Sequence, residues 1–172
     1  MKNIFVFVFI CIFATANFLA AQETVPVSQP DKTDYKTAIG IRLSSSPALQ
    51  NNSISLKHFI NETTAIEGLF SFSDPLTIGA LLEFHNPFTS PGLQWMYGFG
   101  GYIGTGKEYD PAKARDITKT YFGAQGIVGI DYKFGRIPLN LSIDWKPELN
   151  LVSDINFEPA ALGLTARFTF GK

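Results

Sequence analysis

The stretch that decides the fold runs from Gly126 to Lys146 and reads GIVGIDYKFGRIPLNLSIDWK. Apolar residues occupy every second position on both sides of Gly135 and Arg136, and charged, polar or glycine residues occupy the positions between them. A period of two is that of a β-strand with two different faces, and a glycine between two such runs indicates a hairpin turn. The stretch therefore predicts two antiparallel strands, each with one apolar and one polar face.

The same alternation recurs on both sides of this stretch, from Tyr35 to the end of the chain. Turn residues such as Asp74 and Pro75 separate the runs, and the longest predicted loop extends from Thr105 to Thr120. A second loop is predicted from Ser153 to Pro159. The eight predicted strands lie within 38–43, 54–57, 66–72, 76–84, 94–103, 122–134, 137–146 and 162–170. Eight two-faced strands in succession favour a closed antiparallel barrel, which leaves no strand edge exposed.

The faces decide between two kinds of barrel. A soluble, lipocalin-like cup would have to enclose the apolar set, including Phe70, Trp95, Trp145 and Phe168, in an interior only just wide enough for ordinary side chains. The opposite face alternates charges with glycines such as Gly40, which suit a narrow lumen. We therefore predict that the apolar face points outward, so that the fold class is all-β, an eight-stranded antiparallel transmembrane β-barrel.

The first residues are typical of an export signal. Lys2 is followed by an apolar run from Ile4 to Phe13 and then by small residues ending at Ala21. A retained membrane helix is the alternative, but the solid apolar run is too short to span a bilayer. The only cysteine, Cys11, lies in this segment. These features predict a cleaved signal peptide (1–21), a flexible N-terminal segment rich in polar residues (22–34) and an outer-membrane β-barrel domain (35–172).

Composition and motifs argue against several function classes. The formal net charge is -1, from 14 basic and 15 acidic residues, so no electrostatic footprint for nucleic acid is present. The run from Gly101 to Lys107 has the spacing of a phosphate-binding loop, but Glu108 follows where such loops carry Ser or Thr. His58 is predicted on the lipid-facing side and His85 in the lumen, and neither lies in a nucleophile motif. We predict no catalytic site, cofactor or metal site.

Charged residues on the inward face form the candidate site. Turns centred on Glu62 and Pro75 place Lys57 beside Glu67 and Glu67 beside Glu83, while Arg42, Asp144 and Lys146 form a second tier nearer the extracellular end. Two adjacent carboxylates can perform acid–base chemistry or hold a cation, and the alternative is a structural ion network that fills the lumen. The predicted lumen charge network comprises Arg42, Lys57, Glu67, Glu83, Asp131, Lys133, Asp144, Lys146 and Arg167.

The chain resembles the small bacterial outer-membrane β-barrel proteins of the OmpA and OmpX kind. The stretch Gly126–Lys146 and the final strand, with Phe168 and Phe170, carry the resemblance most specifically. It implies export to the bacterial outer membrane, contact with outer-membrane lipids, and recognition of the C-terminal strand by the barrel-assembly machinery, although Gly171 and Lys172 extend beyond the terminal aromatic residue.

Together these observations predict a non-enzymatic outer-membrane barrel with a plugged or narrow charged lumen and a structural or surface-interaction role. Loop 105–120, with Tyr109 and Ile117, is the predicted contact for an extracellular partner. The alternatives are a small channel or a lateral path for small or apolar solutes and, with less support, an outer-membrane lipid-modifying enzyme.

Overall fold

The computed structural model of the chain describes residues 35–44, 52–110, 115–152, 155–159 and 161–171. The predicted signal peptide and flexible segment lie outside these residues. No helix in the described ranges is long and apolar enough to cross a membrane. The strands are β1 (Thr37–Ser44), β2 (Ser53–Phe59), β3 (Thr64–Ser71), β4 (Leu76–Pro87), β5 (Leu93–Asp110), β6 (Arg115–Lys133), β7 (Leu139–Trp145), β8 (Glu148–Asn150), β9 (Asn156–Glu158) and β10 (Leu162–Phe170).

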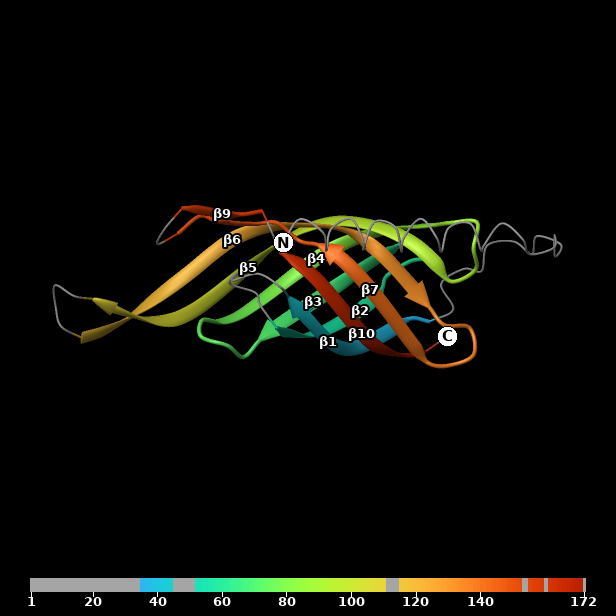
Figure 1. The fold of residues 1–172 in the computed structure, drawn as a ribbon, viewed down its shortest axis with the longest axis horizontal. Coiled ribbons are helices and arrows are strands. Elements are labelled where there is room, and N and C mark those ends of the chain that lie inside the picture. The colour runs from blue at the N-terminus through green and yellow to red at the C-terminus, as the bar shows by residue number, and fades with distance from the viewer. Residues whose placement is uncertain (1–34, 45–51, 111–114, 153–154, 160, 172) are drawn as a thin grey trace, which may run out of the picture.

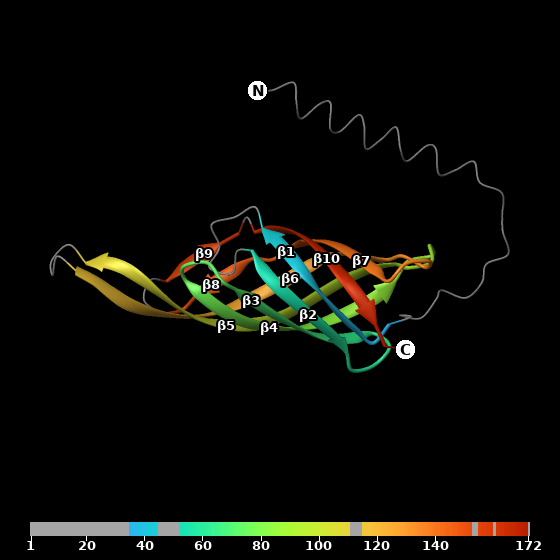
Figure 2. The same cartoon turned by 90° about the horizontal axis from the view of Figure 1, so that it is seen from below.

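These strands form one closed antiparallel barrel (Figures 1 and 2). The neighbours run in the order β5, β4, β3, β2, β1, β10, β7 and β6, and pairing between β5 and β6 closes the ring. The short strand β8 continues β7 beyond Pro147 and also pairs with β6, while β9 pairs with β8 and leads into β10. The predicted eight-stranded barrel is therefore confirmed, with β8 and β9 as an additional hairpin.

The strands are strongly staggered around the ring. Following paired residues from Gly123 of β6 through β5, β4, β3, β2, β1, β10 and β7 leads back to Lys133 of β6, ten residues further along. Such a stagger tilts the strands by roughly 35–45° from the barrel axis, and the interior of an eight-stranded barrel is then filled by side chains.

Two predicted loops are wrong in part. Most of Thr105–Thr120 is not a loop, because β5 continues to Asp110, β6 begins at Arg115, and the two strands stay paired from Thr105 and Thr120 to Asp110 and Arg115. Residues 111–114 lie outside the described residues. The glycines and charges read as turn signals here, but a ribbon that extends past the other strands needs no apolar face (Figure 1). Its Thr, Tyr and Ile residues favour a strand. Ser153–Pro159 likewise contains β9.

The two faces of the wall have opposite character. Large apolar side chains project from the outer face, and Ile41, Phe99 and Ile143 are 60%, 61% and 65% exposed. We call these exposed residues of the outer face the apolar belt. The inward positions carry buried charged and polar side chains, including Arg42 and Lys57. The predicted orientation, with the apolar face outward, is confirmed.

Glycine is required for steric reasons at two positions that face the lumen. A Cβ at Gly40 would lie 1.9 Å from the backbone oxygen of Ala166, and one at Gly100 would lie 1.9 Å from the backbone oxygen of Ala80. No side chain fits such a separation. The small residues predicted for a cramped interior are therefore required where neighbouring strands approach closely.

Candidate functional site in the barrel lumen

The lumen has two recognisable ends. The termini end is where β1 begins and β10 ends, and the hairpin end is where the ribbon of β5 and β6 extends past the other strands (Figure 2). The largest group of buried charges lies toward the termini end, and we call it the termini-side tier. Its members come from β2, β3, β4, β6 and β10 and are at most 2% exposed: Lys57, Glu67, Glu83, Asp131 and Arg167.

Lys57 bridges two carboxylates across the lumen. Its Nζ lies 2.8 Å from Oε2 of Glu83 and 3.2 Å from Oδ2 of Asp131. Asp131 also accepts a hydrogen bond from the side-chain amide of Asn140 on β7. One ammonium therefore connects β2, β4 and β6, strands that are not neighbours in the ring.

Arg167 is the second cation of the tier, and its guanidinium is surrounded by partners. Nη2 pairs with Oε1 of Glu67. Nε donates to Oγ of Ser55 at 2.6 Å, and Nη1 donates to Oδ1 of Asn140 at 3.1 Å and to Oγ of Ser142 at 2.9 Å. Ser55 in turn donates its hydroxyl proton to Glu67. Charge-assisted contacts of this kind fix a planar guanidinium in orientation as well as position.

Aromatic rings close the lumen at the termini end. Tyr35 and Phe59 are both buried, with ring centroids 5.2 Å apart in an edge-to-face arrangement. Phe59 also packs against His85, with centroids 4.9 Å apart. His85 Nε2 lies 3.0 Å from Oε2 of Glu83. Through His85, the rings of Tyr35 and Phe59 are thus connected to the termini-side tier.

A second group of charges, the hairpin-side tier, lies nearer the other end. Nη2 of Arg42 pairs with Oδ1 of Asp144, and Nζ of Lys146 pairs with Glu148 and donates to Oε1 of Gln125 at 3.1 Å. The structure thus brings together Arg42 and Asp144, as the pattern predicts, and adds two partners for Lys146. A buried apolar cluster also lines the lumen: Leu69, Leu81, Met96 and Ile127.

One predicted strand register is wrong by two residues. The pairing of Lys57 with Glu67 is confirmed, but Glu67 lies opposite Leu81, and Glu83 lies opposite Ala65. The connection between β3 and β4 is centred on Asp74, because Ser71 pairs with Thr77, and not on Pro75. A shift of two residues keeps every side chain on its predicted face, so both glutamates still point into the lumen.

Lys133 does not join the charge tiers. Its Nζ donates to the backbone oxygens of Phe134 and Ile137 in the connection between β6 and β7. Its parity is that of Asp131, but it is the last residue of β6. At that position a long side chain reaches the turn carbonyls more readily than the lumen.

Sequence reasoning missed Phe59 and Glu148 as lumen residues. Phe59 shares the parity of Ser55 and Lys57, so extending the alternation by one more position would have found it. Glu148 follows Pro147, which ends the ladder of β7 and hides the continued alternation in β8.

The two histidines lie on opposite faces of the wall. His58 is exposed on the outside, where its Nδ1 is 2.9 Å from Oγ1 of Thr37, while His85 is buried in the lumen. They cannot contribute to one shared site. Within the described part of the chain, no group of three or more His, Cys, Asp or Glu side chains has an arrangement that could hold a metal ion.

Comparison with known proteins supports the fold assignment. No protein-family model and no curated protein sequence matches the chain. The N-terminal β-barrel domain of Pseudomonas aeruginosa OprF is similar in structure, with a TM-score of 0.59 and 12% identity over 79% of this chain and 98% of that domain. Neisserial surface protein A (NspA) aligns with a TM-score of 0.48 and 14% identity, over 78% of this chain and 95% of that protein.

At this identity the similarity to the OprF domain concerns the fold alone. The fold is that of the small outer-membrane β-barrel proteins, the class that the sequence resembles.

Proposed function

We propose that the chain is a non-enzymatic bacterial outer-membrane protein whose lumen is closed by charged side chains and which has a structural or surface-interaction role. The main support for this proposal is the distribution of side chains in the barrel wall. The large apolar side chains are exposed on the outside, and the charged side chains are buried in the lumen. An apolar surface of this extent is unfavourable in water but favourable against lipid. Closure of the ring also pairs the backbone groups that a bilayer would leave unsatisfied.

The arrangement of the ends supports one orientation. Barrels of this class have short periplasmic turns and longer extracellular connections. The ribbon of β5 and β6 extends at the hairpin end, which we therefore assign to the cell exterior (Figure 1). Tyr109 on the ribbon is 60% exposed, so it is a suitable anchor for an extracellular partner. The outward aromatics Phe168 and Phe170 of β10 are the features that the barrel-assembly machinery would recognise.

Burial supports a closed lumen and a non-enzymatic role. The termini-side tier connects opposite sides of the ring, and Tyr35 and Phe59 cover it at one end. Glu83 and His85 form a carboxylate–histidine pair of the kind used in acid–base catalysis. Their side chains are only 0% and 1% exposed, so a substrate could not reach them.

Two measurements test the proposal. The protein should fractionate with the outer membrane and migrate faster on gels when unheated than when boiled, because a closed barrel resists detergent unfolding. Refolded protein in planar bilayers should show no steady conductance. Recovery in the soluble fraction without detergent would contradict the membrane location, and a steady conductance of the unmodified barrel would favour the channel instead.

A further inference from the structure

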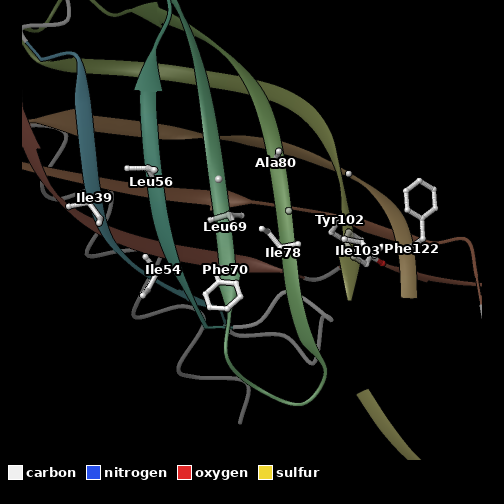
Figure 3. Close-up of a pocket in the computed structure, with 13 residues that line it drawn as sticks. Ile39, Ile54, Leu56, Leu69, Phe70, Ile78, Ala80, Tyr102, Ile103 and Phe122 are labelled. Atoms are coloured by element: carbon white, nitrogen blue, oxygen red, sulfur yellow. The ribbon is translucent and has the colours of Figure 1, made fainter. Parts of the chain in front are cut away.

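The outer face carries a groove whose lining extends from Ile39 of β1 to Phe122 of β6 (Figure 3). Its floor is a row of small residues in register, because Gly68 pairs with Ala80 and Ala80 pairs with Gly101. The next row toward the hairpin end is large and forms one side of the groove: Phe70, Ile78, Ile103 and Phe122. The cavity has a volume of about 760 Å³, and its lining is almost entirely apolar.

Packing within the wall requires a small residue at Gly101, where a Cβ would lie 3.1 Å from the backbone oxygen of Gly123, but not at Gly68. A Cβ at Gly68 would have the backbone oxygen of Leu56 as its nearest neighbour, 3.9 Å away, so a larger residue would fit. Gly40 in the lumen differs, because its Cβ would lie only 1.9 Å from a backbone atom. Glycine weakens a strand interior. The wall thus contains a small residue that it does not itself need, at a point where the outside surface becomes concave.

We propose that this groove holds one acyl chain of a bilayer lipid at a fixed place on the barrel. The inference rests on the proposed membrane location. The groove is continuous with the apolar belt, which meets acyl chains when the barrel is in a bilayer, and its lining offers nothing to a polar headgroup or a peptide backbone. Its volume lies within the roughly 300–1,000 Å³ of cavities that bind small molecules.

The dimensions favour a chain over a second barrel. The six neighbouring strands of the lining span roughly 24 Å, and because the strands are tilted, a path across them rises roughly 15 Å along the barrel axis. One leaflet of the hydrocarbon core is also about 15 Å thick. A stable protein interface needs about 800 Å² from each partner, far more than the floor of this groove provides. A single chain lying across the strands matches the groove in both length and chemistry.

Native mass spectrometry of the full barrel tests the assignment. Protein is transferred from vesicles of dioleoyl phosphatidylglycerol into a mild detergent, and the fraction that retains one lipid is measured. Ala80→Leu and Gly68→Val fill the groove, and we expect each to lower that fraction about fivefold, a change of about 1 kcal/mol. Ala166→Leu is the matched control, because Ala166 also points outward but lies on β10, outside the groove. It should retain lipid like the unmodified barrel.

Gly68→Ala is a milder variant that should fold normally, because it adds only one methyl group in open space. It should lower the lipid-bound fraction by an intermediate amount. Equal retention by the unmodified barrel, the groove variants and the control would overturn the assignment, as would a dimer that only the groove variants abolish. Flotation with vesicles separates the two hypotheses. A barrel that floats but retains no lipid refutes the groove alone, whereas a barrel that does not float refutes the membrane location.

Discussion

Removing the ammonium of Lys57 while preserving the length of the side chain should strongly destabilise the barrel. Lys57→Met leaves Glu83 and Asp131 facing each other without a shared cation. At an effective dielectric constant of about 20, unit charges 2.8 and 3.2 Å apart attract by about 6 and about 5 kcal/mol. Part of this attraction offsets the desolvation of the charges, so we expect a net loss of about 3–5 kcal/mol in unfolding free energy.

The double variant Lys57→Met with Glu83→Gln should recover at least half of that loss, because it removes the nearer stranded carboxylate. Lys57→Met with Glu67→Gln should not recover it, because Glu67 pairs with Arg167 instead. Lys57→Met with Glu148→Gln is the distant control, for which losses should add. Urea unfolding in lipid vesicles measures all three. If the loss with Glu83→Gln is simply additive, the direct contact between these side chains is refuted.

Other perturbations test the wall, the ribbon and the groove floor. Ile143→Arg places a cation on the outer face and should destabilise the barrel in vesicles by roughly 2–4 kcal/mol, whereas an unchanged unfolding curve would contradict a lipid-facing belt. On intact cells trypsin should cut after Arg115 and spare Lys107, whose amide donates to the Asp74 side chain at 3.2 Å; cleavage at either site only after lysis would reverse the orientation. Gly40→Ala should abolish the heat-modifiable gel band and Gly68→Ala should retain it, as their Cβ separations of 1.9 and 3.9 Å require.

The alternation of apolar and polar residues predicts correctly which face of the wall each side chain occupies, even where the predicted pairing between strands is wrong. The predicted partner of Glu83 on β3 is wrong, yet Glu83 points into the lumen as predicted, since an error of two residues does not change the face. Contacts across the lumen are a different matter. The pairing of Lys57 with Asp131 joins strands separated in the ring, and it depends on the stagger of all strands between them. The stagger of the strands around the ring cannot be predicted from the sequence of any single strand or turn.

Local signals also fail where the physical constraint on the sequence changes. Inside the belt, one face must be apolar, and the pattern of Ile143 and its neighbours shows it plainly. Beyond the belt, the ribbon from Gly106 onward has ladder pairing between β5 and β6 alone, with one further hydrogen bond from Lys107 to Asp74, so glycine, lysine and threonine can occupy strands there. The same weaker constraint applies to β9 (Asn156–Glu158), which lies within the predicted loop Ser153–Pro159.

The two arginines of the lumen also determine when the barrel can become stable during assembly. Arg167 on β10 pairs with Glu67, 100 residues earlier, and Arg42 on β1 pairs with Asp144, 102 residues later. Until the first and last strands meet, both carboxylates lack their cations. We therefore expect ring closure and charge neutralisation to occur in one late, cooperative step, and such long-range contacts make folding slow. A chain interrupted before β10 is expected to stay open instead of forming a smaller barrel.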